Sequence, residues 1–121
     1  MDPYQREAVL VKAFGHPTRL HILDILSRGE ACVCHLTTIL RQRQPNVSQH
    51  LMVLREAGLV RDRKDGVIVY YRLSDPLTAD LLGLMREILR STGVEADFPP
   101  IPESPVAGCP CPKCSRSSSC C

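Results

Sequence analysis

Two cysteines separated by a single residue, Cys32 and Cys34, have a type and spacing that could do chemistry. Thiolates bind soft ions, and pairs of thiols also take part in redox reactions. Successive residues of an α-helix are rotated by about 100°, so side chains two residues apart point in nearly opposite directions. In an extended segment the same two side chains lie on one face. We therefore expect that an ion held by both cysteines requires an unwound start of the helix that follows.

Five further cysteines lie within the last thirteen residues, and these are Cys109, Cys111, Cys114, Cys120 and Cys121. The total of seven is odd and no apolar signal region opens the chain, so a disulfide framework is not expected. No stretch is long and apolar enough to span a membrane, and we predict a cytoplasmic protein. In a reducing compartment, closely spaced cysteines more often serve metal or redox chemistry.

Hydrophobic periodicity predicts a domain over residues 1–93 and a flexible tail over 94–121, where six of the ten prolines lie. The expected elements are helices over 4–13, 17–28, 34–40 and 45–57, a hairpin over 60–73, and a last helix between Pro76 and Gly93. Asp65 and Gly66 favour a type I′ turn at the hairpin tip. The last helix is apolar on two sides, which indicates two partners: its own core and a second subunit. We therefore predict a homodimer.

This order of elements predicts a mainly α-helical winged helix-turn-helix with a β-hairpin wing. In that fold the helix over 45–57 places its N-terminal residues against base edges in the major groove of DNA. Its polar side chains outside the apolar stripe are the candidates for base contacts: Gln44, Asn46, Ser48, Gln49 and His50. The alternative is a helical core with a merely polar outer face.

The charge distribution supports a nucleic-acid partner. Residues 41–72 hold seven basic and three acidic residues, a local charge of +4 against +2 for the whole chain. Arg63 and Lys64 at the hairpin tip are candidates for contacts with the DNA backbone, which position a protein without reading sequence.

Three segments, HPTRLHILDIL, EACVCHL and PNVSQHLMVLREAGLVRDRKDGVIVYYRL, resemble the ArsR/SmtB family of metal-responsive transcriptional repressors. The resemblance covers about residues 10–73, with three motifs in the right order and spacing. It implies a homodimer that binds operator DNA when ion-free and dissociates when an ion binds. EACVCHL is similar to the family's arsenite- or antimonite-binding box, so Cys32 and Cys34 are implied as ligands of As(III) or Sb(III).

In this box Thr37 or Thr38 stands where the family's third cysteine is common. Soft trivalent arsenic prefers three thiolates, so the tail cysteines Cys109, Cys111 and Cys114 are candidates for the missing one. Cys111 and Cys114 are three residues apart, and a polyproline II helix has three residues per turn, so their sulfur atoms can share one face. We expect His35 to be an exposed residue of the first helical turn.

Two alternatives stay open for the stimulus. One is a repressor that senses cadmium, lead or zinc, in which His35 could complete the ligand set. The other is a redox regulator in which Cys32 or Cys34 forms a disulfide with a tail cysteine. An enzyme is not expected, because no base-and-orienter pair accompanies a cysteine and so small a domain has no room for a large pocket. Neither an organic substrate nor a membrane partner is expected.

Overall fold

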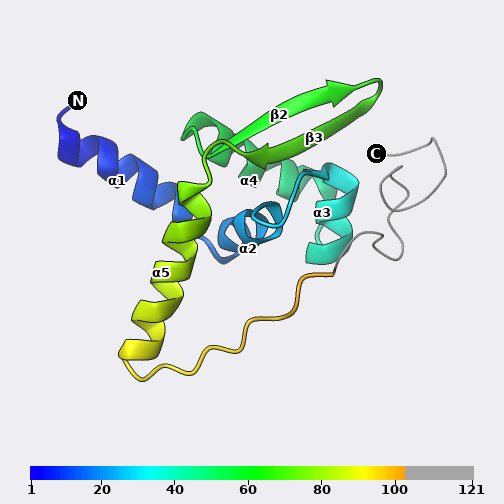
Figure 1. Ribbon diagram of the computed structural model, residues 1–121. Coiled ribbons are helices and arrows are strands. Elements are labelled where there is room, and N and C mark those ends of the chain that lie inside the picture. The colour runs from blue at the N-terminus through cyan, green and yellow to red at the C-terminus, as the bar shows by residue number, and fades with distance from the viewer. Residues whose placement is uncertain (103–121) are drawn as a thin grey trace.

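The structure is a computed structural model, and it describes residues 1–102 as a winged helix-turn-helix (Figure 1). In chain order the elements are α1 (Pro3–Phe14), α2 (Pro17–Leu26), β1 (Ala31–Cys32), α3 (Val33–Leu40), α4 (Gln44–Glu56), β2 (Val60–Asp65), β3 (Ile68–Leu73) and α5 (Leu77–Ser91). The predicted fold class is confirmed, and each predicted helix is present with its bounds shifted by no more than about two residues.

The first two helices begin at side-chain caps. The Asp2 carboxylate accepts the backbone N–H of Gln5 at 2.8 Å, and the Gln5 side chain accepts the backbone N–H of Asp2 at 2.9 Å. At α2, His16 Nδ1 accepts the backbone N–H of Thr18 at 3.1 Å, with Pro17 in the first turn. Each bond satisfies a backbone donor that has no partner within its helix.

The core lies between α2, α3 and α4. Val60 of β2 also lies fully buried in this core. Six of the core's fully buried large side chains come from the three helices, and they are Ile22, Leu23, Leu36, Val47, Leu51 and Leu54. Burying one such side chain stabilises the fold by about 1.5–3 kcal/mol. Because three of the six belong to α4, the core fixes the position of the predicted reading helix against α2 and α3.

The tip of the wing differs from the prediction. Asp65 pairs with Ile68, so the two residues that turn the chain are Gly66 and Val67. Gly66 has a φ of +63° while Val67 stays outside the positive-φ region, whereas type I′ needs positive φ at both positions. Glycine at the first central position is typical of type II′, so the type I′ prediction was wrong.

A short strand, β1, joins the wing and was not predicted. It pairs antiparallel with β3, Ala31 opposite Tyr71 and Cys32 opposite Tyr70, so the sheet order is β1-β3-β2. Two residues are too few to show a period-2 pattern, so only the pairing with β3 makes this strand visible. The wing is therefore tied to the segment that carries Cys32.

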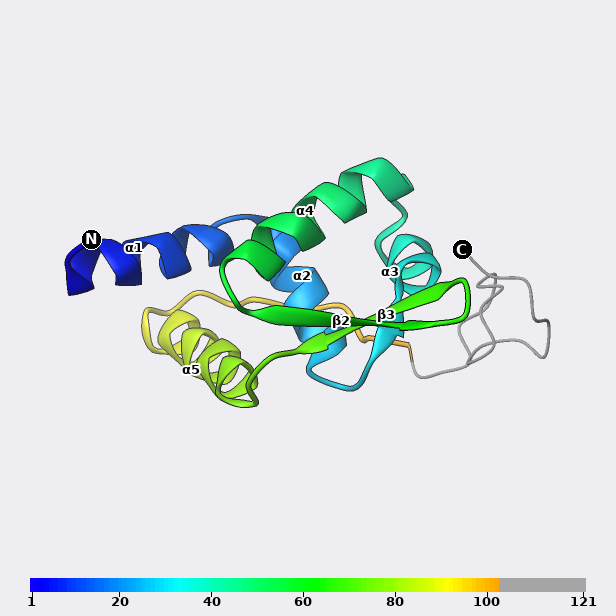
Figure 2. The same cartoon turned by 90° about the horizontal axis from the view of Figure 1, so that it is seen from above.

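Helices α1 and α5 extend away from the wing tip, as both views show (Figures 1 and 2). Leu82 on α5 is buried in the core, whereas the other side of the helix exposes a second apolar stripe: Leu77, Leu81, Leu84 and Ile88. Helix α1 exposes Val9 and Val11. The two-sided apolar pattern read from the sequence of α5 is therefore present in the structure.

Beyond α5 the described chain follows the domain surface to residue 102. Phe98 stacks on the Arg86 guanidinium, whose carbon lies 4.0 Å from the ring centroid, and Arg86 pairs with Asp24 at 2.6 Å. Ile101 packs against the core. The division into residues 1–93 and a flexible tail over 94–121 stays a prediction. Among residues 1–102 no helix is long and apolar enough to cross a membrane.

Candidate functional site

Cys32 lies where β1 ends and α3 begins. Its backbone is extended, with φ −85° and ψ 168°, and its side chain is fully buried. The sulfur accepts the backbone N–H of His35 at 3.4 Å, so Cys32 is the N-cap of α3. One residue thus belongs to the sheet through its backbone and to the helix-turn-helix through its side chain.

Cys34 lies in the first turn of α3 and is partly exposed. It packs against the same small apolar cluster as Cys32, which is formed with Ile68 and Tyr70 of β3. The helix starts between the two cysteines, so Cys32 is already in the extended conformation that shared ligation was expected to need. Cys34 is disulfide-bonded in this structure, so it must be reduced before it can bind an ion.

The next residues of α3 supply no third ligand. The hydroxyls of Thr37 and Thr38 both donate to the backbone carbonyl of Cys34, at 2.9 and 2.8 Å. His35 is buried, with 6% of its surface exposed, so the expectation of an exposed histidine was wrong. The side chain of a first-turn residue lies toward the preceding segment, which here is β1 packed against β3.

No group of three His, Cys, Asp or Glu side chains within residues 1–102 is placed to hold a metal ion. Once the disulfide at Cys34 is reduced, the box offers two sulfur atoms of one cluster as donors, and these suit a soft ion. The candidates for a third thiolate, Cys109, Cys111 and Cys114, lie outside the described residues.

The N-terminal half of α4 presents the predicted base-contacting residues in two groups. Gln44, Asn46 and Gln49 are exposed, and Ser48 is partly exposed. The amide of Asn46 donates to Gln42 Oε1. Gln42 in turn donates to the Thr18 hydroxyl at 3.0 Å, so these two consecutive hydrogen bonds connect the turn before α4 to α2.

His50 lies apart from that exposed group and faces α2. Its Nδ1 is 3.3 Å from an Arg19 guanidinium nitrogen, and its ring centroid is 4.3 Å from that of His16. Arg19 also donates to the backbone carbonyls of Lys12 and Ala13, at 3.1 and 2.7 Å. Burial, and then the neighbouring His16 and Arg19, hold the pKa of His50 below its ordinary value.

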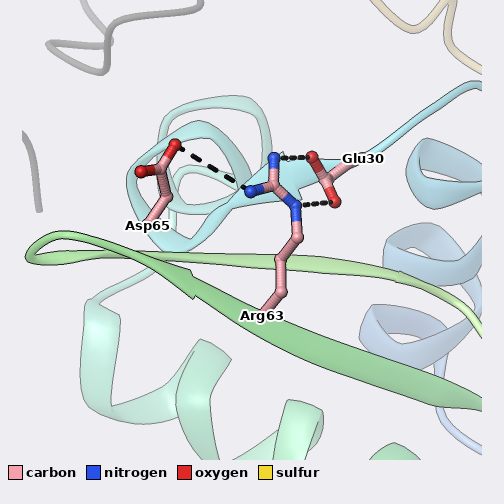
Figure 3. Close-up of polar contacts among 3 residues, drawn as sticks. All are labelled: Glu30, Arg63 and Asp65. Atoms are coloured by element: carbon pink, nitrogen blue, oxygen red, sulfur yellow. Dashed lines mark hydrogen bonds and ion pairs between the residues drawn. The ribbon is translucent and has the colours of Figure 1, made fainter.

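On the wing, Arg63 makes a two-pronged contact with Glu30, the residue before β1 (Figure 3). Arg63 Nε and a terminal guanidinium nitrogen donate to the two carboxylate oxygens at 2.7 and 2.5 Å. A second nitrogen lies 3.9 Å from Asp65. The hydrogen bond to Glu30 is the main cause that raises the pKa of Arg63, so the guanidinium stays charged.

Arg63 also lies over the Tyr70 ring, with the guanidinium carbon 4.6 Å from the ring centroid. Lys64, the other predicted backbone-contacting residue, is exposed. Glu30 and Tyr70 were not among the predicted site residues. The first letter of EACVCHL was a signal for Glu30, but its partner is 33 residues away in the chain and could not be read from spacing.

Comparison with known proteins agrees with this geometry. Residues 16–62 match the model of the bacterial regulatory proteins of the arsR family. The chain is 36% identical to the arsenic resistance transcriptional regulator ArsR1 of Pseudomonas putida, over 82% of this chain and 84% of that protein. It is 52% identical to the arsenical resistance operon repressor of Escherichia coli, over 58% of this chain and 61% of that protein. This chain belongs to the ArsR/SmtB family of transcriptional repressors.

A solved structure supports the same conclusion. The homodimeric winged helix-turn-helix DNA-binding domain Mb0332 of Mycobacterium bovis superposes with a TM-score of 0.67 at 29% identity, over 80% of this chain and 89% of that one. Family and fold make this ArsR/SmtB protein a DNA-binding regulator and not an enzyme, as the sequence predicted.

Proposed function

We propose that this ArsR/SmtB repressor binds operator DNA as an ion-free homodimer and dissociates when As(III) or Sb(III) binds Cys32 and Cys34. The observation that carries the proposal is the double role of Cys32, which ends β1 and caps α3. The names of the Pseudomonas putida and Escherichia coli relatives support arsenic as the stimulus.

The release follows from where Cys32 lies. Its sulfur is buried against β3 and accepts the His35 N–H, so an ion that draws the sulfur away disturbs both the wing and the start of α3. Helix α3 packs against α4, and α4 carries the base-contacting candidates. An N-cap bond to an oxygen contributes about 0.5–2 kcal/mol, and sulfur is a weaker acceptor, so loss of this bond shifts a balanced equilibrium by at most several-fold.

Cys109, Cys111 and Cys114 complete the proposed ligand set. Deleting residues 108–121 should lower ion affinity and leave operator affinity unchanged. The double variant Cys120→Ser/Cys121→Ser is the matched control, because it alters the tail and keeps those three thiols. Unchanged ion affinity in the deletion variant would show that two thiolates suffice.

The dimer surface in this proposal is the stripe Leu77, Leu81, Leu84 and Ile88 together with α1. Leu84→Glu should give monomers in light scattering, because a charge would then be buried between subunits. Such a dimer would read half-sites about one helical turn of DNA apart. A parent protein that is monomeric at micromolar concentration contradicts this part of the proposal.

The decisive experiment is titration of a reduced protein–operator complex, followed by fluorescence anisotropy, with arsenite, antimonite, cadmium, lead and zinc in parallel. Cys32→Ser and Cys34→Ser should bind the operator like the parent and fail to release it. Because Cys32 is fully buried, Cys32→Ala is tested beside Cys32→Ser, and thermal melting checks that each variant folds. If both serine variants released the operator at the arsenite concentration that the parent needs, the proposal would be refuted. If only cadmium, lead or zinc released the operator from the parent, the inducing ion would be one of these and not arsenic or antimony.

A second candidate stimulus is thiol oxidation, which the disulfide at Cys34 favours. Under this alternative a mild thiol oxidant should release DNA without any ion, and a reductant should restore binding. Cys34→Ser should abolish that response, whereas Cys120→Ser/Cys121→Ser serves as the control for oxidation elsewhere.

A further inference from the structure

We propose that the Glu30–Arg63 ion pair, stacked on Tyr70, transmits a change at the cysteine box to the wing. The inference rests on the proposed function and adds a residue pair to it. It assigns Arg63 a positioning role, in place of the DNA backbone contact expected from the sequence.

Figure 3 shows Arg63 reaching from the wing to Glu30, and the strand pairing connects both residues to Cys32 through Tyr70. Tyr70 on β3 pairs with Cys32 of β1 on one side and with Arg63 of β2 on the other. Arg63 reaches back from β2 over the Tyr70 ring to Glu30, two residues before Cys32. The guanidinium therefore spans the sheet and joins its outer strand to the segment that leads into the box.

The chemistry of this contact makes it sensitive to position. Two parallel N–H···O bonds form only when the carboxylate and guanidinium planes face each other, so a small shift of either residue breaks the paired geometry. The Glu30 side chain is 22% exposed and that of Arg63 is 50% exposed. Ion pairs this accessible add little to overall stability, so the consequence of the pair is geometric.

Movement of Cys32 affects both the pairing of β1 with Tyr70 and the ion pair between Glu30 and Arg63. If the Cys32 sulfur leaves the β3 cluster to share an ion with Cys34, β1 loses its register against Tyr70. Glu30 lies two residues away on the same short segment and moves with it. Arg63 then loses its carboxylate partner, and β2 loses its contact with the box, so the wing changes its position relative to α4.

The test separates transmission from binding. Glu30→Gln keeps the shape of the side chain and removes its charge, and Arg63→Lys keeps the charge and removes the two-pronged geometry. Asp65→Asn is the matched control, because Asp65 meets the same guanidinium through a single contact at 3.9 Å. For each protein, operator affinity is measured with and without arsenite, and arsenite affinity is measured without DNA through the sulfur-to-arsenic absorption band.

The expected result is a loss of coupling alone. The coupling is measured as the ratio of operator affinity without arsenite to operator affinity with arsenite, and such ratios are typically about 5–150-fold. In Glu30→Gln and Arg63→Lys this ratio should fall to less than about a third of the parent's. Ion-free operator affinity and DNA-free arsenite affinity should stay within about twofold of the parent, and Asp65→Asn should keep the full ratio. By reciprocity, operator DNA should weaken arsenite binding less in Glu30→Gln than in the parent.

Three outcomes overturn the inference. If Glu30→Gln shows the parent's ratio of operator affinities without and with arsenite, the ion pair has no part in transmission, and the proposed function is unaffected. An unchanged ratio with a smaller salt dependence in Arg63→Gln makes Arg63 a DNA backbone contact instead. A parent protein that binds operator but shows no response to arsenite overturns the proposed function, and the inference with it.

Discussion

The reading helix and the wing are attached to the domain in different ways. Helix α4 buries Val47, Leu51 and Leu54 in the core, and its N-terminal region is tied to α2 through side chains. The wing buries only Val60, at the base of β2, in that core, and the rest of it is attached by the two-residue strand β1, by the small cluster around Cys32 and by two partly exposed ion pairs, Arg63–Glu30 and Arg55–Asp62. Segments with few buried contacts open at lower free energy than core elements.

This contrast agrees with the proposed function, in which the wing and the start of α3 respond to the ion. Cys32 belongs to the weaker attachment, since its sulfur packs beneath the wing and its backbone pairs with β3. Under the proposed function, an ion at Cys32 displaces the wing and the start of α3 without unfolding the core that holds α4. The domain would thus change its DNA affinity while it stays folded.

The largest effect should come from the core attachment of α4. Leu51→Ala should lower the free energy of unfolding by about 2–5 kcal/mol, because it leaves a cavity in a fully buried position. Ile68→Ala, in the small cluster under the wing, should cost clearly less, because a site near the surface can collapse around the gap. Chemical denaturation of both variants measures the difference, and equal losses would remove the contrast between the two attachments.

The next effect concerns base reading by α4. Gln49→Ala should weaken specific operator binding by about 1–3 kcal/mol, because the exposed amide can form paired hydrogen bonds with one base. Binding to unrelated DNA should change little. Parent-like affinity for the operator would mean that the exposed polar face of α4 does not lie against base edges.

A smaller effect should distinguish the wing from the reading helix. Lys64→Ala should weaken binding to operator and to unrelated DNA alike, and should reduce the salt slope of binding by about 1. The measurement is anisotropy over a series of salt concentrations, with Gln49→Ala for comparison. If Lys64→Ala lost specificity at an unchanged salt slope, the wing would be reading bases.

The fold was predictable because its signals are local. Apolar stripes, prolines in first turns and glycines after helices located five helices and a hairpin within about two residues. The exposed group on α4 followed from the same stripe, since Gln44 and Gln49 lie outside it. The turn type was wrong because Asp-Gly favours type I′ at the centre of a turn, and the strand register places Gly66 one position earlier.

The connections within the site were not predictable, because they join residues far apart in the chain. Strand β1 exists only through its pairing with β3, and Glu30 acquires its role only through Arg63. His50 has the composition of a base-reading residue, yet it faces α2, where His16 and Arg19 surround it. Helical spacing gives the face of a helix, but not which edge of that face a neighbouring helix covers.

The smallest effect concerns pH and tests the attachment of α4 to α2. The pKa of His50 is lowered in the folded state, so the unfolded chain binds this proton more tightly. Folding stability should therefore decrease as pH falls below the ordinary histidine value of about 6.5.

His50→Gln should flatten the loss of stability between about pH 7 and 5.5, because the side chain no longer takes up a proton. His21→Gln is the control, because it replaces a histidine on α2 outside the His16–His50 contact. Thermal melting across this pH range gives both slopes. Equal slopes in His50→Gln and the parent would mean that the contact between α4 and α2 carries no proton-linked stability, and that its hold on the reading helix comes from the apolar core alone.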